Sequence, residues 1–386
     1  MPGVYISWPF CAQKCTYCNF ASGIEKPEMQ AQYLDALCRH LSQQVWPWIP
    51  ETVYIGGGTP SLMQPDELAR ILAEVPGYPW PEFTLEAAPG SLHAETVTAW
   101  ARLGVNRVSL GVQSFVEKEL RQTGRRHDAQ GVASDCELLR AKGIGNFNID
   151  LIAGLPHQSA DSWEESLRWV ERLAPPHVSV YMLEVDEDSR LGLEILGEGS
   201  RYGAGAVAPD EGIVANYERA VQVLADLGIP RYEISNFARP GFASTHNLKY
   251  WRMEPYFGFG VDAHSCDGTS RWGSPEATGD YIASVNSGSL PGVGREAVRP
   301  LEEKFLTGLR LDEGLAIDLN TLPEPLRNRI DTLIGQAMLC WNENRLRFTS
   351  RGVLVSNDIF EEFLGADEFL SKTNSIDVVE IQRDNP

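Results

Sequence analysis

The sequence predicts an α/β protein: a partial, TIM-like (β/α)6 barrel followed by a smaller, mainly helical domain with a winged-helix-like end. Short apolar runs alternate with helix-like segments through the first half of the chain, and polar or glycine-rich residues follow almost every run. Successive strand–helix units favour a parallel sheet covered by helices. Right-handed crossovers curl such a sheet into a barrel, and six units rather than eight predict an incomplete one with a wide mouth.

The first half supplies the six strands and their helices. Apolar residues at spacings of three and four, as in Tyr33, Leu34, Leu37 and Leu41, predict the helices. The expected strands are residues 4–8, 52–55, 83–86, 107–111, 147–151 and 177–183. The expected helices are about 27–44, 64–74, 93–103, 116–122, 130–142 and 160–173.

The second half follows a different pattern. A helix is expected at about 210–226 and a strand at 232–234, and the chain looks mainly helical from about residue 300. A strand at 346–349 and a helix at 353–364 suggest the winged-helix-like end. The predicted domains are residues 1–235 and 236–365, and the polar stretch 366–386 is expected to be a frayed tail.

Length and charge narrow the class of protein. A chain of 386 residues favours two domains. The net charge of 33 − 53 = −20 disfavours nucleic acid and anionic membrane surfaces as partners. No signal peptide and no membrane-spanning stretch is apparent, and seven cysteines do not suit a secreted disulfide framework. The expected location is the cytoplasm.

Three cysteines near the start form the strongest motif. Cys11, Cys15 and Cys18 have the spacing C-x3-C-x2-C. Soft thiolates suit an iron–sulfur cluster, and a [4Fe–4S] cluster usually takes four of them. The next cysteine is Cys38, so one iron would be left open for another ligand. Zinc is the rival interpretation, but a structural zinc site needs a fourth Cys or His at a second close spacing.

The carboxyl ends of the predicted strands carry the other candidates. Polar or glycine-rich residues stand there: Gly56 to Thr59, Glu86, Gln113, Asp150 and Glu184. Each alone could be an ordinary turn or capping residue. Because the carboxyl ends of parallel strands meet at one face, where such folds bind ligands, together they favour ligand contact.

The cysteine motif, the run Gly56-Gly57-Gly58-Thr59-Pro60 and the later strand-end residues resemble the radical S-adenosylmethionine (SAM) superfamily. More closely, nearly the whole chain resembles the anaerobic coproporphyrinogen III oxidase family, and within it the heme chaperone branch. The resemblance implies a radical SAM core over 1–235 and an oxidase-like C-terminal domain over 236–365. It also implies a [4Fe–4S] cluster on the three cysteines, with SAM chelating the open iron.

The same resemblance implies which residues contact SAM. The glycines would approach its methionyl end, Arg125 would meet its carboxylate and Asp150 a ribose hydroxyl. The implied contacts are Tyr5, Tyr17, Gly57, Gly58, Thr59, Glu86, Gln113, Arg125 and Asp150.

A later segment matches a motif that is proposed to bind heme in the chaperone branch. The run from His246 to Trp251 reads H-N-x-x-Y-W, and the resemblance implies heme contacts at His246, Tyr250 and Trp251. An imidazole can ligate iron, and aromatic rings can stack on a porphyrin. A lone histidine among aromatics is more often a packed residue, so the axial ligand is left open.

One departure from the oxidases directs the functional prediction. The oxidases carry a further cysteine two residues after the third, where this chain has Phe20, as is typical of the chaperone branch. The chaperone branch mostly has asparagine where this chain has Ala88.

The predicted function is a heme chaperone that transfers heme to an apo-hemoprotein, with SAM as an exchangeable cluster ligand. The alternatives are a radical SAM oxidoreductase acting on coproporphyrinogen III, or a cluster-bearing protein without chemistry.

Overall fold

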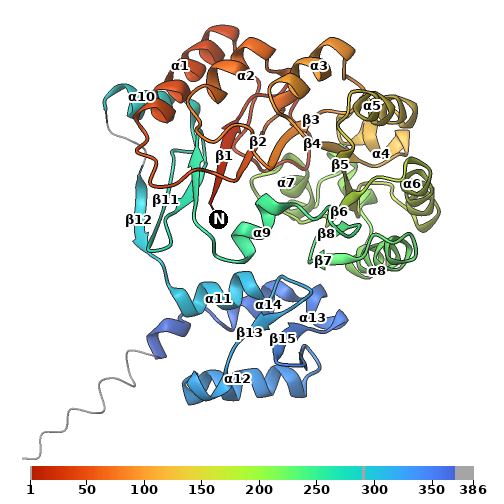
Figure 1. Cartoon of the computed structure of the whole chain (residues 1–386). Coiled ribbons are helices and arrows are strands. Elements are labelled where there is room, and N and C mark those ends of the chain that lie inside the picture. Colours follow the sequence, from red (N-terminus) through yellow and green to blue (C-terminus); the bar gives the residue numbers. More distant parts are fainter. Residues whose placement is uncertain (1, 289–291, 370–386) are drawn as a thin grey trace, which may run out of the picture. The chain divides into compact units, whose positions relative to one another are not determined.

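The structure, a computed structural model, describes residues 2–288 and 292–369. The chain divides into two compact units (Figure 1). The first comprises the residues up to Arg231 together with Ser235–Lys249 and Glu254–Glu296. The second comprises Tyr232–Ile234, Tyr250–Met253 and the residues from Ala297 on.

Six parallel strands in sequence order form the centre of the first unit, which confirms the predicted fold class. They are β1 (Gly3–Trp8), β2 (Thr52–Gly57), β3 (Glu82–Ala87), β4 (Arg107–Gln113), β5 (Asn146–Ala153) and β6 (His177–Met182). The whole sheet has the order β12-β11-β10-β9-β1-β2-β3-β4-β5-β6-β8-β7. Helices cover its outer face (Figure 1).

The helices form where the apolar spacing predicts them. In α1, Tyr33, Leu34, Leu37 and Leu41 are buried as one face. The side chains of Asp128 and Ser159 cap the N-termini of α5 and α6. The helices of the first unit up to residue 226 are α1 (Pro27–Gln43), α2 (Pro65–Leu72), α3 (Ala94–Arg102), α4 (Glu117–Gln122), α5 (Ala129–Ala141), α6 (Ala160–Leu173), α7 (Arg190–Leu196) and α8 (Asp210–Asp226).

The central strands alternate between apolar outer residues and polar inner ones. On β4, Val108 and Leu110 are buried on one face while Arg107 and Ser109 are buried on the other. The inner polar groups bond to one another across strands, as where Asn148 donates to the Ser109 hydroxyl at 2.8 Å. The barrel therefore has an apolar shell under the helices and a polar interior.

Residues 236–296, predicted to belong to the second domain, extend the sheet of the first unit at both edges. β8 (Asn236–Ala238) pairs antiparallel with β6, and β9 (Tyr256–Phe259) pairs parallel with β1. Beyond β9 the sheet continues with β10 (His264–Cys266), β11 (Ser270–Gly273) and β12 (Val293–Ala297), and α10 (Thr278–Asn286) packs on α1. The predicted boundary after residue 235 therefore differs from this division, because β1 takes its second neighbour from beyond it.

The second unit is built around helices with a small sheet of order β13-β15-β14. The ring of Phe305 stacks on that of Phe363 with centroids 4.1 Å apart, at the centre of its core. Its elements are α11 (Pro300–Gly308), β13 (Leu315–Ala316), α12 (Glu324–Gly335), β14 (Leu339–Asn342), β15 (Arg345–Phe348), α13 (Ser350–Leu354) and α14 (Ser356–Glu361).

The start of the predicted tail is packed. Ala366 is buried, and the Asp367 carboxylate accepts hydrogen bonds from the backbone N–H groups of Leu301, at 3.2 Å, and Glu302, at 2.8 Å, in the first turn of α11. Residues 366–369 are therefore part of the second unit, because they cap one of its helices. The rest of the predicted tail, 370–386, lies outside the described residues.

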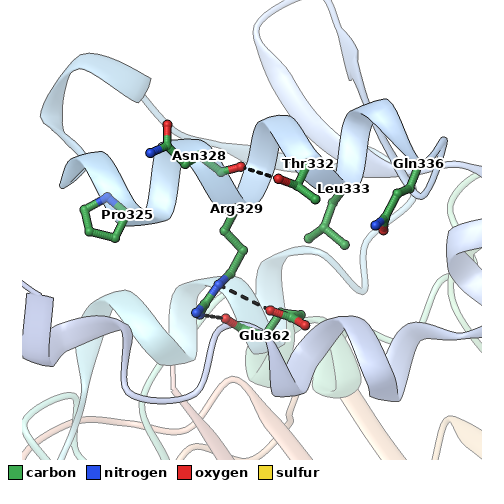
Figure 2. A pocket seen from close by; sticks show the side chains of 7 residues that line it. All are labelled: Pro325, Asn328, Arg329, Thr332, Leu333, Gln336 and Glu362. Atoms are coloured by element: carbon green, nitrogen blue, oxygen red, sulfur yellow. Dashed lines mark hydrogen bonds and ion pairs between the residues drawn. The ribbon is translucent and has the colours of Figure 1, made fainter.

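A pocket lies along α12 in the second unit (Figure 2). The guanidinium of Arg329 reaches from α12 to the carboxylate of Glu362, with Nε and Oε2 3.3 Å apart. None of the residues that line this pocket is a predicted site residue, so it gives no support to a ligand there.

Candidate functional site

The three cysteines lie on the loop that follows β1. Backbone hydrogen bonds close this loop on itself: Cys11 N–H donates to Gly23 at 2.9 Å, and Gly23 N–H donates to Pro9 at 2.8 Å. Thr16 N–H donates to the carbonyl of Thr123, just after α4, at 3.2 Å. The loop is thereby fixed over the carboxyl end of the barrel.

The donor set of this loop fits an iron–sulfur cluster. The three thiols are half-buried, and burial raises the pKa of Cys11, with Cys18 and Cys15 raising it further. Thiols that raise the pKa of one another lie close together in space. Within the described ranges no three His, Cys, Asp or Glu side chains could hold a metal ion. A cluster needs a different arrangement of ligands from a single metal ion, because each thiolate binds its own iron.

A segment after β6 holds the other side of the cysteine loop. Leu191 N–H donates to the Thr16 carbonyl at 2.8 Å, the Arg190 guanidinium donates to the Lys14 carbonyl, and the Asn19 amide donates to the Asp186 carboxylate. The sequence pattern did not predict that α7 would hold the cysteine loop. The signal available was Ser189, which caps the helix by accepting from the Gly192 N–H.

Tyr17 and Arg125 are brought together beside the cysteines. The Arg125 Nε donates to the Tyr17 hydroxyl at 3.0 Å, and a terminal nitrogen donates to the Gly111 carbonyl at 2.6 Å. Burial raises the pKa of Tyr17, so its hydroxyl stays protonated. Arg125 therefore links the cysteine loop to β4, in a position to meet an anionic group at the mouth.

Two carboxylic acids face the barrel interior. Glu86 accepts from the Tyr54 hydroxyl at 2.8 Å and from the Gly57 N–H at 3.2 Å. Asp150 accepts from the Asn148 amide at 2.7 Å and from the Ser109 hydroxyl at 3.2 Å. Burial raises the pKa of both, that of Glu86 to about 7.

The glycine run packs directly on the segment that leads into the cysteines. Gly57 has a φ of 109°, which favours glycine, and a Cβ at Gly58 would lie 2.5 Å from the Phe10 carbonyl oxygen. Gly58 N–H donates to Trp8, and Thr59 N–H to Phe10, each at 2.8 Å. These glycines are thus required by the chain itself, in addition to any approach to SAM.

The remaining two predicted SAM contacts also lie on the barrel strands. Gln113 ends β4 with a φ of 71°, at a register shift between β4 and β5. Tyr5 lies on β1, its ring centroid 6.0 Å from that of Tyr54. The predicted SAM contacts are therefore spread over β1 to β5, the residues that follow β2, the cysteine loop and the segment after α4.

The raised pKa of Glu86 gives a testable pH dependence. Below about pH 7 the carboxyl is protonated, and above it the carboxylate can attract the cationic groups of SAM. We expect SAM affinity for the cluster-loaded protein to rise between about pH 6 and pH 8 and to level off above. Calorimetric titration across this range measures it. Glu86→Gln should flatten the profile, and a Glu86→Gln profile that still rises would refute this role.

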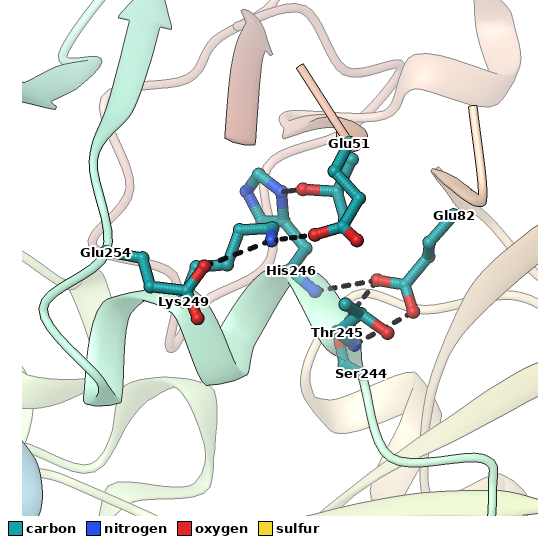
Figure 3. Close-up of polar contacts among 8 residues, drawn as sticks. Glu51, Glu82, Ser244, Thr245, His246, Lys249 and Glu254 are labelled. Carbon is teal, nitrogen blue, oxygen red and sulfur yellow. Dashed lines mark hydrogen bonds and ion pairs between the residues drawn. The ribbon is translucent and has the colours of Figure 1, made fainter. Parts of the chain in front are cut away.

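The predicted heme motif lies at the opposite end of the barrel. It forms α9 (Thr245–Trp251), where the His246 side chain is buried with Nδ1 2.8 Å from the Thr52 hydroxyl (Figure 3). Thr52 begins β2, whereas the cysteines follow the carboxyl end of β1. Because a six-residue strand such as β2 spans about 20 Å, His246 is far from the cysteine loop.

Buried polar contacts fix α9 at this end. Glu82 accepts from the backbone N–H groups of Thr245, at 2.9 Å, and His246, at 2.8 Å (Figure 3). The Lys249 ammonium, 3% exposed, lies 2.6 Å from Glu51 and 3.4 Å from Glu254. Burial lowers the pKa of His246 to about 3, so the imidazole is neutral.

The two aromatic residues of the motif belong to the second unit. Tyr250 and Trp251 are half-buried there, and the Arg310 guanidinium lies 4.3 Å from the ring centre of Trp251. Heme contact at His246, Tyr250 and Trp251 therefore remains a prediction, and it would require His246 to become accessible.

Lys249 should be a large contributor to the stability of the first unit. Lys249→Met removes a buried cation from beside the partly buried carboxylates of Glu51 and Glu254, so we expect a loss of about 3 kcal/mol in the free energy of unfolding. Urea unfolding measures it. The matched control is Arg70→Met, which removes an exposed ion pair to Asp35 and should cost about 1 kcal/mol or less. Equal losses in the two variants would contradict this account.

A partial parallel barrel with three cysteines on the loop after its first strand defines the radical SAM class of protein. Residues 5–170 match the family model described as the radical SAM superfamily. The heme chaperone HemW of Synechocystis is 35% identical over 81% of this chain and 78% of its own length. HemW of Escherichia coli is 33% identical over 94% of this chain and 97% of its own.

A solved structure, that of the coproporphyrinogen III oxidase HemN from Escherichia coli, shares the fold. It has a TM-score of 0.80 at 20% identity and covers 94% of this chain and 89% of that one. The chain belongs to the radical SAM superfamily and, within it, to the HemW family. Membership of the superfamily implies a [4Fe–4S] cluster and SAM. No helix within the described part of the chain is long and apolar enough to cross a membrane.

Proposed function

We propose that this protein is a heme chaperone that binds heme and transfers it to an apo-hemoprotein in the cytoplasm. The observation that carries the proposal is the match to proteins named heme chaperone HemW along nearly the whole chain, including 31% identity over 95% of it for the Bacillus subtilis protein. The exposed Phe20, in place of the further cysteine of the oxidases, supports the same choice.

The [4Fe–4S] cluster and SAM would bind at the mouth of the barrel. Cys11, Cys15 and Cys18 would hold the cluster, whose open iron would take SAM and which could supply an electron. Arg125, already oriented by Tyr17 and Gly111, would bind the SAM carboxylate. Glu86 and Asp150, held by hydrogen bonds from neighbouring strands, would accept from SAM donors.

The oxidoreductase alternative has support from the fold alone, because the oxidase structure is only 20% identical. The two functions differ in product. Reduced, cluster-loaded protein is incubated with SAM and coproporphyrinogen III, and 5′-deoxyadenosine and decarboxylated product are measured. Substrate-dependent formation of both would favour the oxidoreductase, and we expect neither.

Heme binding and release test the proposal directly. Hemin is titrated into the cluster-loaded protein, and apomyoglobin is then added as an acceptor probe. We expect a shift of the Soret band on titration, followed by the myoglobin spectrum. If the Soret band of hemin does not shift, the protein does not bind heme and the proposal is wrong.

A further inference from the structure

The hydroxyl of Tyr54 is a polar group of the barrel interior that none of the predicted SAM contacts includes. Tyr54 lies on β2, and its hydroxyl donates to Glu86 Oε1 on β3 at 2.8 Å. The other oxygen of this carboxylate, Oε2, accepts from the Gly57 N–H at 3.2 Å. Two donors of β2 therefore hold the two oxygens of one carboxylate, which fixes the direction in which its remaining lone pairs point.

The ring of Tyr54 is itself fixed by its neighbours. Its centroid lies 6.0 Å from that of Tyr5 on β1 and 5.2 Å from that of His246 on α9. His246 is in turn held by the Thr52 hydroxyl, which lies 2.8 Å from its Nδ1. Because these contacts restrict the ring, the Tyr54 hydroxyl is preorganised to meet Glu86.

Gly56 leaves the space in which this hydrogen bond forms. A Cβ at Gly56 would lie 2.9 Å from Glu86 Oε1 and 3.0 Å from Tyr54 Cε1, so it would meet both partners. The backbone of Gly56 does not require glycine, because its φ lies outside the positive region that disfavours side chains. Gly57, by contrast, has a φ of 109°. The first glycine of the run is therefore explained by the Tyr54–Glu86 pair and not by its own conformation.

Charged and titratable groups of four strands face Glu86. Burial raises its pKa to about 7; the Tyr54 hydroxyl opposes this rise, Asp150 adds to it, and a backbone N–H and Arg107 oppose it. On β1, Tyr5 also lies near the carboxylate, because Glu86 adds to the rise in the Tyr5 pKa that burial causes. The Tyr54 hydroxyl thus favours the charged form of Glu86 against both burial and Asp150.

We propose that Tyr54 is a positioning residue for SAM: its hydroxyl fixes the direction of the Glu86 carboxylate, in the space that Gly56 leaves open. This inference rests on the proposed SAM contact at Glu86. A carboxylate attracts cations and accepts hydrogen bonds on both oxygens only when it is ionised. A hydroxyl that holds both its direction and its charge therefore raises the affinity for SAM, and Tyr54 acts through Glu86 without binding SAM itself.

The pH profile of SAM binding tests this role, because a purely structural role of Tyr54 would not move it. SAM is titrated calorimetrically into the cluster-loaded wild type and Tyr54→Phe between about pH 6 and pH 8.5. We expect the rise in affinity to move up by about one pH unit in Tyr54→Phe, because a hydrogen bond to a charged group contributes about that much. Affinity should be about fivefold lower at pH 7 and within about twofold of the wild type at pH 8.5.

Two companion variants separate the hydrogen bond from the loss of a hydroxyl. Gly56→Ala keeps the Tyr54 hydroxyl but displaces the Glu86 carboxylate, so its profile should move in the same direction as that of Tyr54→Phe. Tyr33→Phe removes a fully buried hydroxyl that donates to the Ser7 carbonyl at 2.6 Å. Its profile should keep the midpoint of the wild type.

A second measurement follows Glu86 without SAM. The infrared band of a protonated carboxyl that is absent from Glu86→Gln belongs to Glu86. In the cluster-free protein this band should titrate at about pH 7 in the wild type and about one pH unit higher in Tyr54→Phe.

The outcomes separate Tyr54 from the SAM contact itself. If the SAM profile of Tyr54→Phe keeps its midpoint, or if affinity falls equally at every pH, Tyr54 does not position Glu86 for SAM, whatever the infrared band does. The contact at Glu86 would then still stand, provided that Glu86→Gln flattens the profile. A Glu86→Gln profile that still rises would overturn both. None of these measurements uses hemin, so failure of this inference is distinct from failure of heme transfer.

Discussion

Cys15→Ala will leave the reconstituted protein without its cluster, with iron and sulfide at the level of the unreconstituted protein. Three thiolates are already one fewer than a [4Fe–4S] cluster usually takes, so a site with two cannot hold the cluster firmly. SAM binding should be lost as well, because the open iron is its anchor. Metal and sulfide analysis after anaerobic reconstitution, followed by SAM titration, measures both effects.

Cys340→Ala is the matched control for the cysteine motif. Cys340 is also a free, half-buried thiol, but it lies on β14 of the second unit. We expect this variant to keep its iron, sulfide and SAM affinity. Equal losses in the two variants, or zinc without sulfide in the wild type, would contradict a cluster at Cys11, Cys15 and Cys18.

Gly58→Ala will destabilise the cysteine loop. The added Cβ would lie 2.5 Å from the oxygen and 2.7 Å from the carbon of the Phe10 carbonyl, and backbone atoms cannot rotate away as a side chain could. We expect a loss of about 1–3 kcal/mol in the free energy of unfolding, typical of overpacking. Cluster retention should fall too, because Phe10 immediately precedes Cys11. Urea unfolding of the cluster-free protein and iron analysis after reconstitution measure these effects.

Gly23→Ala is the matched control in the same loop. Nothing lies within 4 Å of a Cβ built at Gly23, and its φ is not in the region that favours glycine. Its stability should stay within about 0.5 kcal/mol of the wild type, as for most surface substitutions. If Gly58→Ala is as stable as Gly23→Ala, close packing of the glycine run on Phe10 is not what fixes the loop.

The central barrel could be predicted because its signals are local. The helix predicted at 160–173 matches α6 (Ala160–Leu173), and the strand predicted at 177–183 matches β6 (His177–Met182), since each depends on periodicity within its own segment. The polar interior was also readable. In Arg107-Val108-Ser109-Leu110 the polar residues alternate with apolar ones, and period two puts them on a separate face.

Long-range pairing could not be read from the sequence. The local pattern of residues 256–259 does not predict that they pair with β1, which lies about 250 residues earlier in the chain. His246 matched a motif, but its burial depends on Thr52 and Glu82, which come from distant strands. A motif predicts which residue types occur together, whereas access to a ligand depends on tertiary packing.

The central claim is that one protein carries both a SAM-binding cluster and transferable heme. Anaerobic reconstitution followed by SAM and hemin titration of the same sample, with apomyoglobin added last, tests it most directly. The account predicts cluster absorbance, SAM binding, a Soret shift, and then recovery of the heme as holomyoglobin. A sample that binds SAM at its cluster but neither shifts the Soret band nor yields holomyoglobin would contradict it.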